Sequence, residues 1–218
     1  MRGLVFDLEV LYFSTFRKPN STSLILTYTI PPFTTIRGMI ANALGLQRDD
    51  YSLQDEIKIG IAVKEFGFKN TEMAKILKLK ENKNRPIRNY PSSPMFREYV
   101  VNPEYTVFLG SDEYAINKIF NALKFPERPL YLGQSDDLVD LKIYSPIDIE
   151  EVEADYVDSV VEEIMPGATI EKLPYKFFEE NGKYSVEFKL VSIPKSLPIK
   201  LSIEKKLWKF KNKVIQIV

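Results

Sequence analysis

Side chains that can bind phosphate gather in one stretch of this sequence. The whole chain of 218 residues balances 30 lysines and arginines against 30 aspartates and glutamates. Between Lys64 and Arg97, however, nine basic residues stand against only three acidic ones. A local excess of positive charge is the feature with which proteins neutralise nucleic-acid phosphates. This stretch is therefore a candidate polyanion-binding surface, and its central cations are Lys78, Lys80, Lys83, Arg85 and Arg88.

Aromatic and cationic side chains also alternate near the N-terminus. Arg17 and Lys18 follow Phe13 and Phe16, just before the turn expected at Pro19. Aromatic rings stack on unpaired bases while cations hold the backbone, so this mixture suits single-stranded nucleic acid. The same segment also fits a plain connection between two strands, and the sequence leaves that alternative open.

The composition excludes several kinds of catalysis. The chain has no histidine and no cysteine, which excludes triads of serine or cysteine with histidine and also thiolate metal sites. Eight acids fall within 148–163, but without a recognisable ligand spacing, so neither a metal nor a cofactor is expected. Tyrosine and lysine can still cleave RNA without a metal when their pKa values are shifted. Their spacing singles out no reactive set, and the available tyrosines are Tyr12, Tyr28, Tyr90, Tyr99 and Tyr131.

An amphipathic helix is predicted within residues 29–45. Two prolines precede a threonine pair that offers a helix cap, and apolar residues then recur at helical spacing up to Gly45, which can end the helix in the left-handed conformation. Arg37 is expected in the first turn, where helix amides face outward and attract an anion. An ordinary helix with Arg37 as a solvated side chain is the alternative.

The order of the remaining elements predicts an α+β fold. Apolar alternation predicts strands at 2–11 and 57–68, a third over 97–109 with an edge or bulge at Pro103, and a last one within 129–144. A second helix begins after a cap at Ser111 or Asp112. Strand, helix, strand, strand, helix and strand make a split βαβ, ferredoxin-like sandwich, similar to an RNA-recognition module. The charged excursion at 69–94 is expected to be a projecting hairpin or a mobile surface insertion.

The last third of the chain is predicted to be a small β-rich unit. Gly133 is the only glycine within 129–144 and indicates a tight turn whose backbone approaches something closely. The composition changes near Pro146, which predicts domains at 1–145 and 146–218. Within the second, Asn181 and Gly182 are typical of a hairpin turn.

No apolar run approaches the length that spans a membrane, and the N-terminus does not resemble a signal peptide. A soluble cytoplasmic protein without a membrane partner is therefore expected.

Three segments in order resemble a known family. They are YTIPPFTTIRGMIANALG at 28–45, MFREYVVNPEYTVFL at 95–109 and RPLYLGQSDDL at 128–138. Together they resemble the fifth CRISPR-associated (Cas) protein family, of the RAMP superfamily. The shared features are the PP, threonine, IRG and ALG groups in the first, the arginine, glutamate and aromatic start of a strand in the second, and the P-LYLG-S turn in the third.

The resemblance implies an RNA-binding subunit of a type I, Cascade-like surveillance complex in antiviral defence. Such a subunit has a ferredoxin-like domain with a β-hairpin thumb, here the excursion at 69–94, and holds the 5′ handle of the CRISPR RNA. Its partners would be the backbone RAMP subunit and the large subunit, with target DNA bound only indirectly. By position in the motifs, phosphates would face Arg37, Arg97 and the turn from Gly133 to Ser135, with Tyr99 beside Arg97.

One branch of this family is a metal-independent endoribonuclease that uses tyrosine, lysine and histidine. This chain lacks histidine, so the non-catalytic branch is favoured. Cleavage of repeat RNA remains the first alternative. The second alternative is a protein-binding scaffold whose basic excursion docks on an acidic neighbour without touching RNA. The lysine-rich end of the chain has no matching motif.

Overall fold

The computed structural model describes residues 1–21, 24–77 and 92–218, and these form an α+β fold as predicted. The helices are α1 (Phe33–Ala43), α2 (Leu53–Glu56) and α3 (Glu113–Lys124). The central sheet contains β1 (Arg2–Val10), β4 (Lys58–Glu65), β7 (Glu104–Ser111), β8 (Val139–Ile143) and β9 (Ile147–Asp148). A second sheet contains β2 (Phe13–Ser14), β3 (Leu24–Ile25), β5 (Phe68–Leu77) and β6 (Ser92–Val101). The C-terminal strands are β10 (Glu150–Val157), β11 (Thr169–Glu180), β12 (Lys183–Ile193), β13 (Ile199–Phe210) and β14 (Lys213–Ile215).

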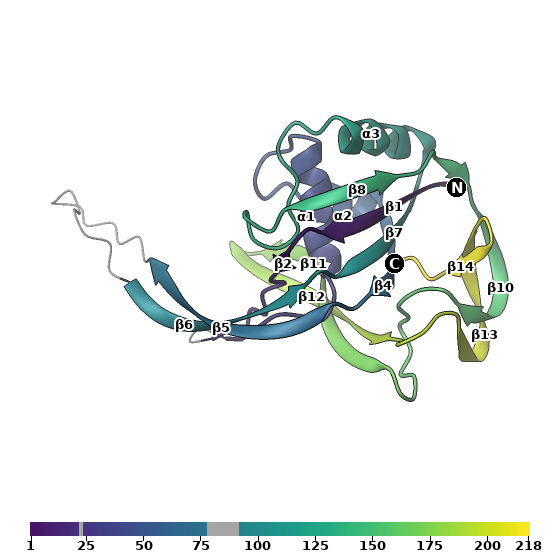
Figure 1. The fold of residues 1–218 in the computed structure, drawn as a ribbon. Helices are drawn as coiled ribbons and strands as arrows, with labels where there is room; N and C mark the ends of the chain where they lie inside the picture. Colours follow the sequence, from purple (N-terminus) through teal and green to yellow (C-terminus); the bar gives the residue numbers. More distant parts are fainter. Residues whose placement is uncertain (22–23, 78–91) are drawn as a thin grey trace.

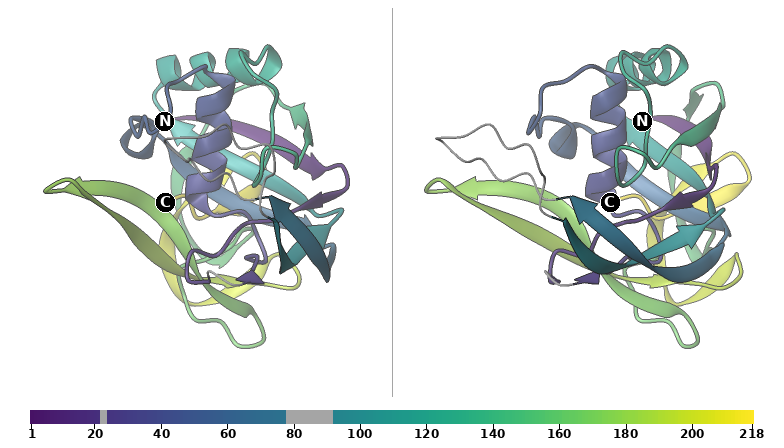
Figure 2. Two further views of the ribbon diagram at one scale, coloured as in Figure 1. Left: turned by 90° about the vertical axis from the view of Figure 1, so that its left-hand side faces the viewer. Right: turned by 60° about the vertical axis from the view of Figure 1, so that its left-hand side comes forward.

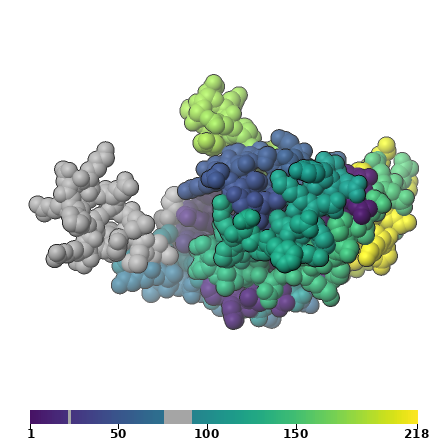
Figure 3. All heavy atoms as spheres, turned by 90° about the horizontal axis from the view of Figure 1, so that it is seen from above, coloured from purple at the N-terminus to yellow at the C-terminus, as the bar shows by residue number. Residues whose placement is uncertain are grey.

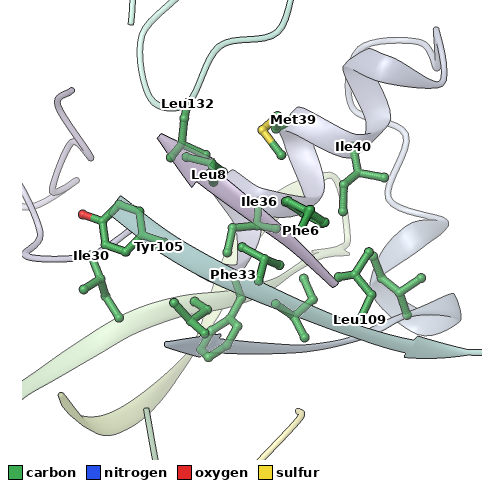
Figure 4. Packing of buried hydrophobic residues seen from close by; sticks show 14 of the residues in the cluster. Phe6, Leu8, Ile30, Phe33, Ile36, Met39, Ile40, Tyr105, Leu109 and Leu132 are labelled. Atoms are coloured by element: carbon green, nitrogen blue, oxygen red, sulfur yellow. The ribbon is translucent and has the colours of Figure 1, made fainter. Parts of the chain in front are cut away.

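The central sheet has the strand order β4-β7-β1-β8, and all of its pairings are antiparallel. Alternate residues of β1, such as Phe6 and Leu8, point to one face, as the sequence pattern predicts. Helices α1 and α3 cover this face, and Figure 4 shows Ile36 and Ile40 of α1 lying against β1 and β7. These side chains are almost fully buried, so the sheet and its helices form the main core.

The opposite face of the central sheet is covered by the end of the chain. Phe108 of β7 packs there against Phe210 of β13, with ring centroids 5.2 Å apart. A Cβ on Gly60 would lie only 2.5 Å from Cγ2 of Ile215, so the absence of a side chain lets β14 approach the sheet closely. Strands β13 and β14, in the part of the chain where the sequence predicted a β-rich unit, therefore cover the face of the central sheet opposite α1 and α3.

Strands β5 and β6 form an antiparallel hairpin that extends away from the body of the molecule (Figure 1). The prediction of one interrupted strand over 97–109 was wrong. Residues up to Val101 belong to β6 in the second sheet, and residues from Glu104 belong to β7 in the central sheet. Asn102 has a positive φ of 48° and precedes Pro103, so the chain changes direction there. The strand expected at 57–68 likewise ends at Glu65, before Gly67 and the start of β5.

The start of α1 differs from the prediction. Pro32 is the N-cap residue, with no side-chain hydrogen bond, so the threonine pair lies inside the helix instead of capping it. Arg37 consequently lies beyond the first turn, and it is buried, which contradicts the alternative of a solvated side chain. Gly45 does end the helix region with a φ of 70°, and Asp112 caps α3 by accepting from the amide of Ala115 at 2.8 Å.

Strands β11 and β12 form a long hairpin that passes α1 and projects beyond it (Figures 2 and 3). Its turn is made by Asn181 and Gly182, which both have positive φ angles, as the sequence predicted. Leu173, Val191 and Ile193 at the base of the hairpin are buried in the main core. The base of this hairpin is therefore anchored in the main core, beside α1.

Candidate nucleic-acid interface

The guanidinium of Arg97 is held in place at the base of the β5–β6 hairpin. Arg97 lies opposite Glu72 in the strand register, and its Nη2 and Nε lie 2.7 and 2.9 Å from Oε1 of Glu72. Only 14% of the Arg97 side chain is exposed. An arginine paired in this way loses little further side-chain entropy when it binds an anion.

Two aromatic rings, in contact with each other, lie beside the same guanidinium. Its Cζ lies 5.2 Å from the ring centre of Phe13 and 5.8 Å from that of Tyr99, and the two rings meet edge to face. Arg97 and Tyr99 share a face of β6 because they are two residues apart, and β2 pairs with β6 to bring Phe13 beside them. The three side chains form a surface with one cation and two rings, which we call the Arg97 cluster. Such a surface can hold a phosphate and stack a base.

Arg17 and Lys18 lie in the connection that follows β2. Arg17 is exposed, whereas Lys18 is half-buried, with its Nζ 3.1 Å from Oε1 of Glu171 and 4.9 Å from the ring centre of Tyr28. The other oxygen of Glu171 accepts from the amide of Thr29 at 2.9 Å. Lys18 therefore ties this connection to β11, and Arg17 is the more accessible of the two cations.

The turn at Gly133 is organised around a buried carboxylate. Oδ2 of Asp137 accepts from the amides of Thr15 and Gln134 at 2.8 and 2.9 Å. Gly133 has a φ of +115°, and a Cβ there would lie 2.7 Å from Oδ2 of Asp137, so the turn admits no side chain at this position. Burial raises the pKa of Asp137, and Ser135 at the outer edge of the turn is exposed. The close backbone approach predicted for Gly133 is thus a contact with the protein itself.

Arg37 lies in a different environment from Arg97. Its Nη1 donates to the backbone carbonyl of Tyr175 in β11, and its Cζ lies 4.9 Å from the ring centre of the same residue. Among the described residues, its Nε and Nη2 have no hydrogen-bond partner. Burial lowers the pKa of Arg37, because the charged guanidinium is removed from water without a carboxylate directly paired to it.

The remaining predicted cations fall on the part of the chain that is not described. Lys78, Lys80, Lys83, Arg85 and Arg88 lie outside the described residues, as does Tyr90. The structure therefore brings Arg97, Tyr99 and Phe13 together and sets the Gly133 turn against Ser14 and Thr15, next to Phe13. It places Arg37 elsewhere, beside Tyr175.

Sequence reasoning missed several partners of these residues. Glu72 was counted only as an opposing charge, and Asp137 was seen only as part of a motif. Tyr175 and Glu171 come from the last third of the chain, where no motif could be matched. Of these four partners, only Glu72 could have been found from the sequence. Opposite charges that face each other across a hairpin stabilise it, so a cation such as Arg97 was to be expected opposite Glu72.

The described residues contain neither a candidate metal cluster nor a candidate membrane-spanning helix. No group of three or more aspartates and glutamates lies close enough to hold a metal ion within these ranges. In the same ranges, no helix has the length and hydrophobicity needed to cross a bilayer.

Comparison with protein families identifies the chain. Residues 3–185 match the family described as CRISPR-associated protein (Cas_Cas5). This match covers most of the chain, including α1, the Arg97 cluster and the Gly133 turn. The chain therefore belongs to this family, as its motifs predicted. A comparison with curated proteins gives no match.

Solved structures show the same fold at low sequence identity. One is a chain of a CRISPR RNA-guided surveillance complex, with 15% identity, coverage of 90% of both chains and a TM-score of 0.60. Another is a CRISPR protein from Archaeoglobus fulgidus, with 17% identity, coverage of 100% of this chain and 98% of that chain, and a TM-score of 0.52. At such identities the likeness concerns the fold alone.

Proposed function

We propose that this protein holds the 5′ handle of a guide RNA, without cleaving it, as a subunit of a type I CRISPR interference complex. The observation that carries the proposal is the Arg97 cluster. A fixed guanidinium beside the rings of Phe13 and Tyr99 offers one site for a phosphate next to aromatic surface on which a base can stack. The family match and the fold shared with a chain of a surveillance complex support this function over a purely protein-binding scaffold.

The topology supports the finer parts of the proposal. The strand order β4-β7-β1-β8, with α1 and α3 on one face, is what a ferredoxin-like RAMP domain would have. The β5–β6 hairpin would be the thumb, which puts the Arg97 cluster at its base. The handle would then run past the base of the thumb, within reach of Arg17 and the Gly133 turn. The backbone RAMP subunit and the large subunit would be the neighbours, and target DNA would be met only through them.

The mechanism we propose is placement of the RNA backbone. Arginine binds a phosphate through a planar fork, and Glu72 sets the direction of that fork before the RNA arrives. The two rings then offer stacking faces to bases that are splayed out of a helix. No proton transfer is needed for this role, so the lack of histidine is no obstacle.

The function can be tested with labelled repeat RNA in the presence of EDTA. The purified protein is titrated across a salt series, and each reaction is scored for retention and for cleavage. We expect retention that depends on the handle, intact RNA, and a log–log salt slope of about 0.7 per phosphate neutralised. Specific cleavage that persists in EDTA would instead support the endoribonuclease. Retention that is absent both for the protein alone and for the assembled complex would support the scaffold.

A further inference from the structure

A cavity of about 290 Å³ lies on the face of the central sheet opposite α1 and α3, where β13 and β14 leave part of the sheet uncovered. The turn between β13 and β14 forms one rim of this cavity. Val5 and Asp7 of β1 share this face, and Thr106 of β7 lies opposite Asp7 in the register. The volume is at the lower limit of about 300 Å³ for small-ligand sites, so the cavity suits one bulky side chain better than a larger ligand.

Lys211, in the turn between β13 and β14, has a backbone conformation that lysine rarely adopts. Its φ is +56°. Every other described residue with a positive φ is a glycine, an asparagine or an aspartate, and these are the residue types that tolerate this conformation. Asn212 follows directly, so the turn has a tolerant residue one place away from the position that would use it. A strained position that keeps a lysine indicates that the side chain has a function there.

Lys211 and Lys213 give the rim two positive charges without a neutralising partner. Both side chains line the cavity, and both residues are exposed. Within residues 1–21, 24–77 and 92–218, neither lysine forms an ion pair. By contrast, four lysines of β13 each lie within 3.6 Å of a carboxylate oxygen, and they are Lys200, Lys205, Lys206 and Lys209. The rim is therefore the part of the cavity that attracts an anion.

The opposite end of the cavity is polar, but its charges already balance. The carboxylate of Asp7 accepts hydrogen bonds from Thr106 at 2.7 Å and from Tyr144 at 2.8 Å. Lys64 Nζ lies 3.4 Å from Asp7 and 3.3 Å from Glu104. Asp7 is thus occupied and offers no strong site for a cationic ligand. The hydroxyl oxygen of Tyr144, which donates its proton to Asp7, can still accept a hydrogen bond from an N–H group of a ligand.

Apolar side chains line the cavity between these two ends. Phe108 and Phe210 are each only 2% exposed and form its packed floor, with ring centroids 5.2 Å apart. Val5 and Ile147 are half-buried, so an apolar side chain in the cavity would remove more of their surface from water. The two phenyl rings are buried too deeply to offer their faces to a base. The cavity therefore lacks the stacking surface that single-stranded RNA uses.

We propose that this cavity is a docking site for a segment of a neighbouring protein subunit that carries a bulky apolar side chain next to an acidic one. The apolar side chain lies over Val5 and Ile147, and the carboxylate faces Lys211 and Lys213. Charge complementarity favours this partner, since two unpaired cations attract a carboxylate and the small cavity accepts a single anchoring side chain. The inference rests on the proposed function in one respect, that the protein works inside a complex of several subunits.

The test uses the whole protein and three peptides of defined sequence, acetyl-Glu-Phe-Glu-amide, acetyl-Glu-Ala-Glu-amide and acetyl-Lys-Phe-Lys-amide. Each peptide is titrated while the backbone amide resonances of residues 212 and 213 are followed. The cavity variant is Lys211→Asn/Lys213→Gln, which removes both charges. Asparagine tolerates a positive φ, so this variant should melt at or above the temperature of the wild type. The matched control is Lys200→Gln/Lys206→Gln, which removes two exposed lysines of β13 that do not line the cavity.

We expect the acidic phenylalanine peptide to bind more tightly than either of the other two peptides. The cavity variant should weaken its binding by about five- to tenfold, the scale for the loss of two exposed charge contacts, and the control variant should bind it as the wild type does. In the assembled complex, the cavity variant should lower the amount of partner subunit that copurifies. The affinity of the isolated protein for repeat RNA should not change.

Three results would overturn the docking site. Equal binding of the three peptides, or wild-type binding by the folded cavity variant, would show that the cavity does not select an acidic apolar segment. A loss of RNA affinity in the cavity variant as large as that in Arg97→Ala would assign the two lysines to RNA. Self-association of the wild type that the cavity variant loses would make a second copy of this chain the occupant.

Failure of the proposed function would give a different result. If neither the protein nor its assembled complex retains repeat RNA, handle binding is wrong, but selective binding of the acidic phenylalanine peptide would still support the docking site. Arg97→Ala should weaken RNA binding and leave the peptide-induced shifts at residues 212 and 213 unchanged. The two proposals therefore stand or fall on separate measurements.

Discussion

A side chain on Gly67 would overlap the carbonyl oxygen of Val101. Gly67 joins β4 to β5, and Val101 ends β6, so this contact lies where the hairpin leaves the central sheet. Gly67 has a φ of +64°, and Asn102, in the connection between β6 and β7, has a φ of +48°. Gly67 thus packs against Val101 and Pro103, the two residues on either side of Asn102, at the base of the hairpin.

Gly67→Ala should therefore lower the free energy of unfolding by at least about 2 kcal/mol, because the left-handed conformation and the overlap with backbone both oppose a Cβ. Gly167→Ala is the matched control, since Gly167 has a φ of +77° but open space around its Cβ position. It should cost about 1 kcal/mol. Urea unfolding measures the free energy of unfolding of both variants. Equal decreases would contradict this account, because they would show that the backbone around Gly67 can move to make room for a Cβ.

The stability of the Gly133 turn should depend more on the acceptor oxygen of Asp137 than on the negative charge of its carboxylate. Asp137→Ala leaves the amides of Thr15 and Gln134 without an acceptor and should cost about 2 to 4 kcal/mol. Asp137→Asn keeps an oxygen there and should cost less than about 1 kcal/mol. Equal losses in the two variants would contradict this account.

The pH dependence of Asp137 follows from its raised pKa. Burial raises the pKa of Asp137 in the folded protein above its ordinary value of 3.8. The charge of Asp137 therefore lowers stability as the pH rises from 3.8 through the folded pKa, and below 3.8 this loss is absent. Asp137→Asn should lack this component of the stability profile. Urea unfolding of the wild type and the asparagine variant across this pH range measures it, and parallel profiles would contradict the burial of a charged carboxylate.

Glu163 should contribute stability that acid removes. Hydrogen bonds from Lys205 and Ser202 lower its pKa from 4.5 to about 2, and Lys205 Nζ lies 2.5 Å from its Oε2. Because the folded pKa is depressed, the contribution is complete above 4.5 and is lost as the pH falls through about 2. At neutral pH, Glu163→Gln should have a lower free energy of unfolding than the wild type. This difference should disappear as the pH falls through about 2. Glu204→Gln, an exposed neighbour on β13, should show no such difference.

The sequence predicted features whose cause is local. The spacing of apolar residues located α1. The left-handed conformation after this helix was predicted from Gly45 itself. The cap of α3 was predicted from Asp112, which accepts from the amide of Ala115, three residues later. The Asn181-Gly182 turn is equally local. Each of these depends on residues within a few positions, so a single sequence carries the full signal.

Features that depend on distant residues were missed. Arg37 is buried because its partner Tyr175 lies 138 residues further along the chain, and no local pattern reports that contact. The strands on either side of Asn102 alternate alike, so periodicity could not show that they belong to different sheets. Gly133 was correctly predicted to mark a close approach, but no local pattern could show that two of its neighbours are Ser14 and Thr15, from the start of the chain.

The most direct test of the proposed function is the affinity of the Arg97→Ala variant for repeat RNA. Removing one charge-assisted contact should weaken binding by about 1 to 3 kcal/mol and lower the salt slope by about 0.7, while Arg97→Lys should recover the slope but not the full affinity. Lys206→Ala on β13 serves as the control, because it removes an exposed cation 3.6 Å from Glu151. Wild-type affinity and slope in a folded Arg97→Ala protein would contradict handle binding at the Arg97 cluster.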